Sequence, residues 1–166
     1  MSAASRILRR VPARICAVTM MASMFAGAIA RAEDVPAYCA ELRQVAAGAL
    51  ARDKFAGIIG KPRAGNYLET TVALPGWEDC AFYGTRSYTC DSHGFNTAEE
   101  GDRALANILG EVKACLRDGW AEDPSRASPG YVVLHDNRQV AAITINTDRT
   151  DKGEHIVRLV LFLRSR

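Results

Sequence analysis

The sequence lacks the short motifs that usually mark a bound metal, phosphate or cofactor. It has no Cys-x-x-Cys pair, no glycine-rich phosphate loop after a strand pattern and no His-Glu-x-x-His helix. We also find no internal repeat and no low-complexity tract. Because 166 residues are enough for a single hydrophobic core, these absences favour one ordinary domain with no cofactor and no metal.

The first part of the chain has the composition of an export signal. Residues 1–14 include four arginines and no acidic residue, and residues 15–30 carry no charge. The uncharged run is rich in small residues and is shorter than the roughly 20 apolar residues that a membrane span needs. Ala-Arg-Ala at 30–32 suits a signal peptidase. We therefore predict a cleaved signal peptide over 1–32 and a single domain over 33–166.

An excess of basic residues is missing once this segment is set aside. Residues 1–32 hold five of the 21 basic residues and none of the 19 acidic ones, which leaves 16 basic residues and a net charge of about −3. A mildly acidic domain lacks the basic surface that phosphate neutralisation requires, so nucleic-acid binding is disfavoured. No second long apolar run follows, so we predict no membrane span after signal cleavage.

The cysteines outside the predicted signal form an even set of four: Cys39, Cys80, Cys90 and Cys115. In an oxidising compartment an even set favours two disulfides, and the closest spacing, ten residues, does not suit a zinc site. The protein is therefore expected to be periplasmic or secreted.

The pairing of the cysteines follows from a predicted hairpin. Segments 77–83 and 86–91 are predicted as two strands joined around Gly84. A register centred on Thr85 places Cys80 opposite Cys90 and Phe82 opposite Tyr88, all on one face. Directly opposed residues are close enough for a disulfide.

The remaining pair connects two predicted helices. Cys115 lies about 18 residues into the second helix, which puts it roughly 27 Å from the strand end that bears Cys90. We therefore predict that Cys115 pairs with Cys39 in the first helix.

Periodicity predicts an α+β fold with an antiparallel sheet of about five to six strands and two helices packed on one face. The first helix is predicted over 34–52, and a second runs from a capping box at Thr97 to Gly119, which we expect to end it in the left-handed conformation. Strands are predicted over 67–74, 77–83, 86–91, 131–135, 139–146 and 155–163, with a loop over 121–130. Short connections between strands favour antiparallel pairing.

Four residues are candidates for catalysis. Asp91 and His93 lie in a polar cluster after the hairpin, and a histidine beside a carboxylate suits acid-base chemistry. His135 and Asp136 at a later strand end are a second such pair. Residues adjacent in the chain seldom point at one another, so turn formation explains the first cluster better than catalysis does.

Two tryptophans are candidates for binding. Trp77 and Trp120 each follow a glycine at the end of a predicted element, where an aromatic ring can contact a partner or a sugar. The competing interpretation is that they seal the ends of the core, because large aromatic side chains normally bury much of their area.

The sequence therefore favours an exported, non-catalytic binding protein of the bacterial cell envelope, with a protein or envelope component as its partner. An inhibitor-like or toxin-neutralising role fits this description by analogy. The alternative is a small periplasmic hydrolase that uses Asp91 and His93, joined by His135 and Asp136.

Overall fold

A computed structural model of the chain describes residues 35–164. The predicted signal peptide over 1–32 lies outside the described residues. The helices are α1 (Cys39–Leu50) and α2 (Ala98–Leu116), and the strands are β1 (Ile59–Pro62), β2 (Tyr67–Thr70), β3 (Glu78–Tyr83), β4 (Ser87–Asp91), β5 (Trp120–Glu122), β6 (Tyr131–Asp136), β7 (Ala141–Arg149) and β8 (His155–Leu163). Across 35–164 we find no helix that is both long enough and apolar enough to cross a membrane.

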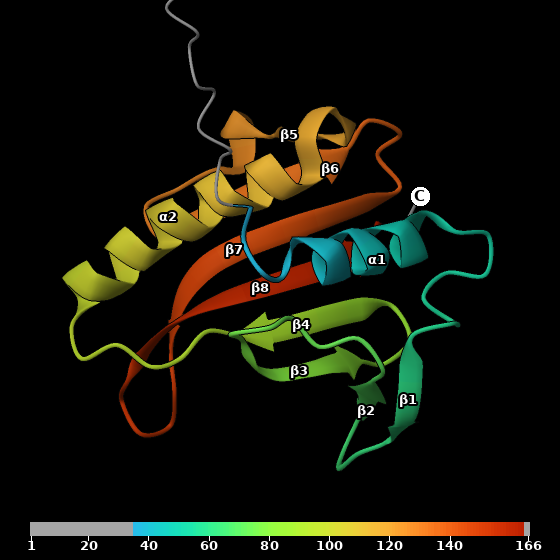
Figure 1. The fold of residues 1–166 in the computed structure, drawn as a ribbon. Helices are drawn as coiled ribbons and strands as arrows, with labels where there is room; N and C mark the ends of the chain where they lie inside the picture. The colour runs from blue at the N-terminus through green and yellow to red at the C-terminus, as the bar shows by residue number, and fades with distance from the viewer. Residues whose placement is uncertain (1–34, 165–166) are drawn as a thin grey trace, which may run out of the picture. The chain divides into compact units, whose positions relative to one another are not determined.

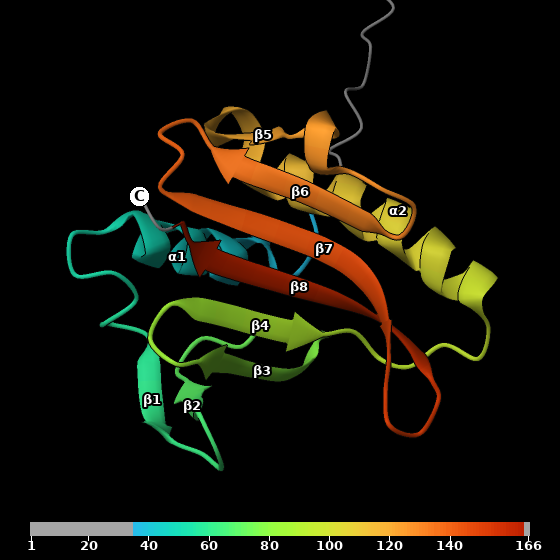
Figure 2. The ribbon, with the colours of Figure 1, turned by 180° about the vertical axis from the view of Figure 1, so that it is seen from behind.

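The eight strands form one antiparallel sheet with the order β1-β2-β3-β4-β8-β7-β6-β5. Both α1 and α2 pack on the same face of this sheet, which we call the core face (Figure 1). Neither of them covers the opposite face, which we call the outer face (Figure 2). The predicted α+β class and the antiparallel pairing are confirmed.

The sheet has more strands than the five to six that the sequence predicts. The additional strands are β1 and β5, which are 4 and 3 residues long and form the two edges. Segments this short show no alternation of their own, and their conformation is set by hydrogen bonds to the neighbouring strand. The predicted loop over 121–130 therefore begins with part of an edge strand.

Strand β2 is shorter than predicted because of a local side-chain bond. The Oγ1 atom of Thr70 accepts the backbone N–H of Val72 at 3.1 Å and donates to the carbonyl of the same residue at 2.9 Å. Such bonds turn the backbone away from the sheet ladder. Val72 and Leu74 remain buried although they lie outside the strand.

The core face carries a continuous apolar row across the sheet. Directly paired residues share a face, so one row runs through six neighbouring strands: Leu68, Phe82, Tyr88, Leu161, Ile143 and Leu134. The helices close this core with their own apolar stripes, including Leu42 and Val45 of α1 and Leu105 and Val112 of α2.

The start of α2 agrees with the sequence, whereas its end differs. The Thr97 hydroxyl accepts the N–H of Glu100, and the Glu100 carboxylate accepts the N–H of Thr97, as the capping box predicts. The helix ends at Leu116, and the next residue, Arg117, has a positive φ of 51° with ψ −141°. The prediction for Gly119 is wrong, because that glycine closes a short 3-10 turn that follows the helix.

Both predicted disulfides are present. Cys39 of α1 is bonded to Cys115 of α2 with a Cα–Cα distance of 5.1 Å, and Cys80 is bonded to Cys90 across the hairpin at 4.1 Å. The predicted hairpin register is confirmed by the pairing of Phe82 with Tyr88. The first bond joins the two helices over the core face.

Candidate functional site

An ion-pair network joins three strands on the outer face. Arg158 of β8 donates from Nε to Asp91 Oδ1 at 2.7 Å and from Nη2 to Asp91 Oδ2 at 2.9 Å. Its Nη1 also donates to Asp148 of β7. The strand register explains this meeting, because Arg158 is paired directly with Asp91 on one side and with Asn146 on the other. Both carboxylate oxygens of Asp91 therefore accept hydrogen bonds from Arg158.

The two carboxylates hold Arg158 in its charged form. The hydrogen bonds and charge of Asp91, with a further contribution from Asp148, raise the pKa of Arg158 above its ordinary value despite partial burial. The side chain of Arg158 is 35% exposed, so the network stays accessible from solvent. A guanidinium fixed by two carboxylates keeps its remaining N–H groups for another acceptor, since Arg has five donors.

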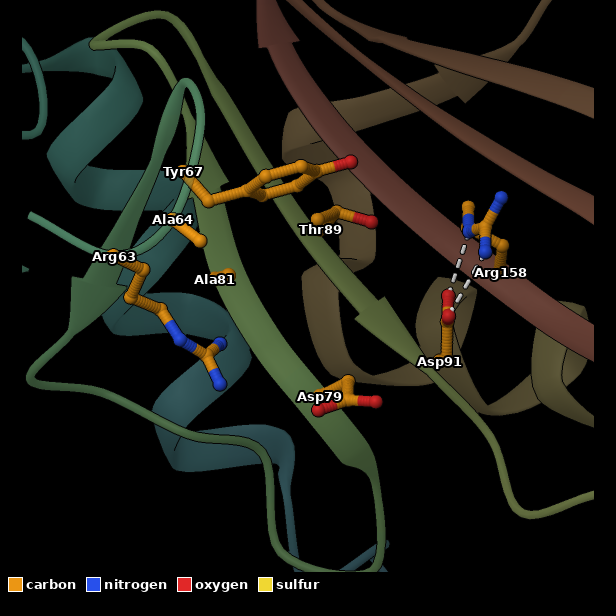
Figure 3. A pocket seen from close by; sticks show the side chains of 8 residues that line it. All are labelled: Arg63, Ala64, Tyr67, Asp79, Ala81, Thr89, Asp91 and Arg158. Carbon is orange, nitrogen blue, oxygen red and sulfur yellow. Dashed lines mark hydrogen bonds and ion pairs between the residues drawn. The ribbon is translucent and has the colours of Figure 1, made fainter.

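A pocket of about 470 Å³ opens beside this network on the outer face (Figure 3). It is lined by Arg63, Ala64, Tyr67, Asp79, Ala81, Thr89, Asp91 and Arg158. Figure 3 shows Arg63, Tyr67, Thr89 and Asp79 around the short side chain of Ala81. The pocket therefore has a small-residue floor and a polar rim.

Local backbone features place the rim of this pocket. The backbone N–H of Arg63 donates to the carbonyl of Tyr67 at 2.8 Å, which closes the turn between β1 and β2, and Gly65 in that turn has φ 66°. Asp79 lies at a register shift between β3 and β4 and has φ 45°. A bulge of this kind re-aims a side chain out of the regular alternation.

The outer face also carries most of the exposed large apolar side chains. Among the described residues four such side chains are exposed, and Tyr67 (45%), Tyr83 (53%) and Tyr131 (37%) belong to this face by their register. The rings of Tyr67 and Tyr83 make an edge-on contact with centroids 5.4 Å apart. The fourth, Val35, lies before α1.

His93 and Trp77 meet at a different place, on the helix side of the hairpin. Both line a cavity of about 310 Å³ that also includes Tyr38, Phe95 and residues of α2. The ring of His93 lies 4.7 Å from that of Phe95, and the ring of Trp77 packs edge-on against Tyr38 at 5.8 Å. Trp77 is partly buried against the core, so it has both a packing role and an accessible surface.

Tyr38 is fixed at one side of this second cavity. Its hydroxyl donates to Glu111 of α2 at 2.7 Å. Burial, followed by the hydrogen bond and the charge of Glu111, raises the pKa of Tyr38 well above the ordinary tyrosine range. Tyr38 therefore stays protonated and links the segment before α1 to α2.

The structure does not bring Asp91 and His93 together. They line different pockets, and within the described residues no hydrogen bond joins their side chains. Ser92 between them is buried, and its hydroxyl donates to the carbonyl of His93 and accepts the N–H of Val157, each at 2.9 Å. The hydrolase hypothesis stays a prediction, but Asp91 is not placed to orient His93.

The carboxylate of Asp136 is hydrogen-bonded to the backbone of the turn between β6 and β7. Asp136 is 1% exposed, and its carboxylate accepts the N–H groups of Val140 and Ala141 at 2.7 Å and of Arg138 at 2.9 Å. These bonds satisfy the turn and fix the register of two long strands. His135 precedes it in the strand and faces the opposite side of the sheet.

Trp120 begins the edge strand β5. It is paired with Asp136 of β6 and is partly buried against the core. The two tryptophans therefore lie at separate places, and only Trp77 lines one of the cavities described above. No group of three or more His, Cys, Asp or Glu side chains within 35–164 is arranged to hold a metal ion.

Sequence reasoning missed Arg63, Tyr67, Asp79 and Arg158 as members of one pocket. One signal was present, because Arg158 interrupts the apolar strand over 155–163 and a charge there needs a partner. No signal indicated that the partner is Asp91, which lies 67 residues earlier in the chain.

No protein-family model, curated protein or solved structure matches this chain.

Proposed function

We propose that the protein is an exported, non-catalytic binding protein of the cell envelope that contacts a protein or another envelope component through the outer face of its sheet. The observation that carries this proposal is that three of the four exposed large apolar side chains in 35–164, Tyr67, Tyr83 and Tyr131, lie on the face that α1 and α2 leave uncovered, with Tyr67 and Tyr83 in edge-on contact. Tyrosine is enriched where proteins meet, because its ring is large, amphipathic and has few rotatable bonds.

The edges of the sheet favour recognition by the face over strand addition. A partner that adds a strand needs a long unpaired edge, and the edges here are β1 and β5, of 4 and 3 residues. Strand β1 also has a register shift against β2 and ends at Pro62. Short, irregular edges are typical of proteins that avoid pairing there.

The two disulfides support the exported location. Cys39–Cys115 and Cys80–Cys90 use all four cysteines of the described chain, and such bonds persist in oxidising compartments. The periplasm or the exterior of the cell is therefore the proposed location, in agreement with the predicted signal peptide.

Capture of a partner from an envelope extract tests the proposal. The full chain, expressed with its own N-terminal segment and purified with both disulfides formed, should retain a stoichiometric partner, and Tyr83→Ser should reduce its recovery about tenfold or more, as expected for an interface aromatic. Val35→Ser is the matched control, because Val35 is also exposed, at 58%, but does not belong to the sheet.

Equal recovery with Tyr83→Ser and with the unmodified protein would argue against the outer face as the interface.

The variant His93→Ala distinguishes the proposed binding protein from the alternative hydrolase. A binding protein of the proposed kind tolerates that change, whereas the alternative hydrolase would lose its activity while remaining folded.

A further inference from the structure

The charges around the outer-face pocket are not all paired. Arg158 is paired with both Asp91 and Asp148, whereas Arg63 and Asp79 form no ion pair with any residue in 35–164. Both line the same pocket, so one unpaired cation and one unpaired anion face a common space without meeting each other. This arrangement suits a ligand that carries one charge of each sign.

The rest of the rim offers further hydrogen-bond donors, from the paired guanidinium of Arg158 and from a hydroxyl group. Three of the five N–H donors of Arg158 are used by Asp91 and Asp148, which leaves two for a ligand. Because two carboxylates already contact this guanidinium and give the network a net charge of about −1, it suits a neutral carbonyl oxygen better than another anion. The hydroxyl of Thr89 lines the same space.

We propose that this pocket binds a short peptide with a free amino end and a free carboxylate end. Arg63 takes the carboxylate, Asp79 takes the ammonium group, and Arg158 with Thr89 takes a peptide carbonyl. The volume of about 470 Å³ lies within the range of small-molecule sites and leaves room over Ala64 and Ala81 for small side chains. This inference rests on the proposed function, because it places the peptide on the outer face, which is the surface proposed to bind the partner.

Titration of the full oxidised chain with Ala-Ala, followed by NMR chemical shifts, tests the ligand class. The dipeptide with both ends free should shift resonances of the pocket residues. The N-acetyl form lacks the ammonium group and the amide form lacks the carboxylate, and each should bind about tenfold more weakly or worse, since hydrogen bonds to charged groups are strong. Equal binding of a capped form would overturn the assignment.

Paired variants test the residues. Arg63→Gln and Asp79→Asn should each weaken binding of Ala-Ala about tenfold, and Asn at position 79 tolerates the positive φ. The matched controls are Arg103→Gln and Asp102→Asn, which remove exposed charges on α2, on the other face of the sheet. Their binding should match that of the unmodified protein.

One further variant distinguishes failure of this inference from failure of the proposed function. Tyr131 of β6 belongs to the outer face but does not line the pocket, whereas Tyr83 packs against the pocket residue Tyr67. Tyr131→Ser should therefore reduce partner recovery while leaving Ala-Ala binding intact. Absence of any shift with millimolar Ala-Ala would overturn the peptide site, whatever the partner experiment gives.

Discussion

The two faces of the sheet are built from the same strands but differ in burial and in polarity. On β8, Leu159 and Leu161 are fully buried beneath the helices, whereas Arg158, Val160 and Phe162 between and beside them are only partly buried on the outer face. The core face is apolar from β2 to β6, and the outer face mixes charge, hydroxyls and tyrosines. Burial therefore concentrates stability on one face and leaves the other available for recognition.

This contrast gives a rule for substitutions. Changes to the core face or to the helix layer should lower the free energy of unfolding by several kcal/mol, because they remove buried contacts or chain constraints. Changes to the outer face should alter binding more than folding.

Removing the disulfide that joins the helices should have the largest effect. Replacing Cys39 and Cys115 by Ala opens a link with a sequence separation of 76, and the chain-entropy model gives a loss of about 4.5 kcal/mol. Replacing Cys80 and Cys90, with a separation of 10, should cost about 2.7 kcal/mol. Urea unfolding of both double variants checks the order, and a larger loss for the hairpin pair would contradict it.

Neighbouring residues on β8 test the two faces directly. Leu161→Ala should lower the free energy of unfolding by about 3 kcal/mol, because Leu161 is fully buried between Tyr88 and Ile143 in the core row. Val160→Ala on the outer face should cost about 1 kcal/mol, since its side chain is partly exposed. Equal losses in denaturant melts would mean that the outer face is buried against something in solution.

Asp136 should behave as a structural residue. Asp136→Ala leaves three backbone N–H groups of the turn without their acceptor and should cost about 2 kcal/mol. Asp136→Asn keeps one oxygen and should lose less. Thermal unfolding measures both variants, and a fully stable Asp136→Ala protein would show that the carboxylate does not hold the turn.

Alkaline pH should lower the free energy of unfolding through the buried side chain of Tyr88. Burial raises the pKa of Tyr88 well above its ordinary value of 10.0, and its hydroxyl donates to the carbonyl of Val72 at 2.9 Å. The folded state therefore keeps a proton that the unfolded chain loses, so this contribution is intact below pH 10 and falls above it by up to about 1.4 kcal/mol per pH unit.

Tyr88→Phe tests that pH dependence. The variant should be slightly less stable at neutral pH, because the Val72 carbonyl loses its donor, but its stability should fall less steeply above pH 10. Tyr38→Phe should flatten the remaining slope, since the pKa of Tyr38 is also raised. Unfolding curves across this pH range give the slopes, and an unchanged slope in both variants would contradict the assignment.

The outer-face network should contribute least to stability. Asp91→Asn weakens the pair with Arg158, but both side chains are partly exposed, so the loss should be about 1 kcal/mol or less. The same variant should still alter the outer-face pocket. A loss as large as that of Leu161→Ala would mean that the network is part of the folding core.

Much of the fold follows from local pattern. The capping box at Thr97, the hairpin register at Phe82 and Tyr88 and both disulfide pairings follow from spacing alone, because each depends on residues whose relation is local or restricted by helix and strand geometry. The edge strands β1 and β5 and the end of α2 at Arg117 do not, because neighbouring strands and the turn that follows decide them.

For the candidate site, the tertiary structure decided more than it did for the fold. The sequence by itself determined the α+β class, the two faces of the hairpin and the cysteine framework, since alternation and helical spacing are properties of the chain. Only the tertiary structure decided that Asp91 contacts Arg158 rather than His93, and that Arg63 and Asp79 share a pocket. The physical reason is that strand order and local irregularities set these contacts. The sheet places β4 beside β8, so Asp91 meets a residue 67 positions later in the chain. The turn between β1 and β2 and the bulge in β3 bring Arg63 and Asp79 to the pocket.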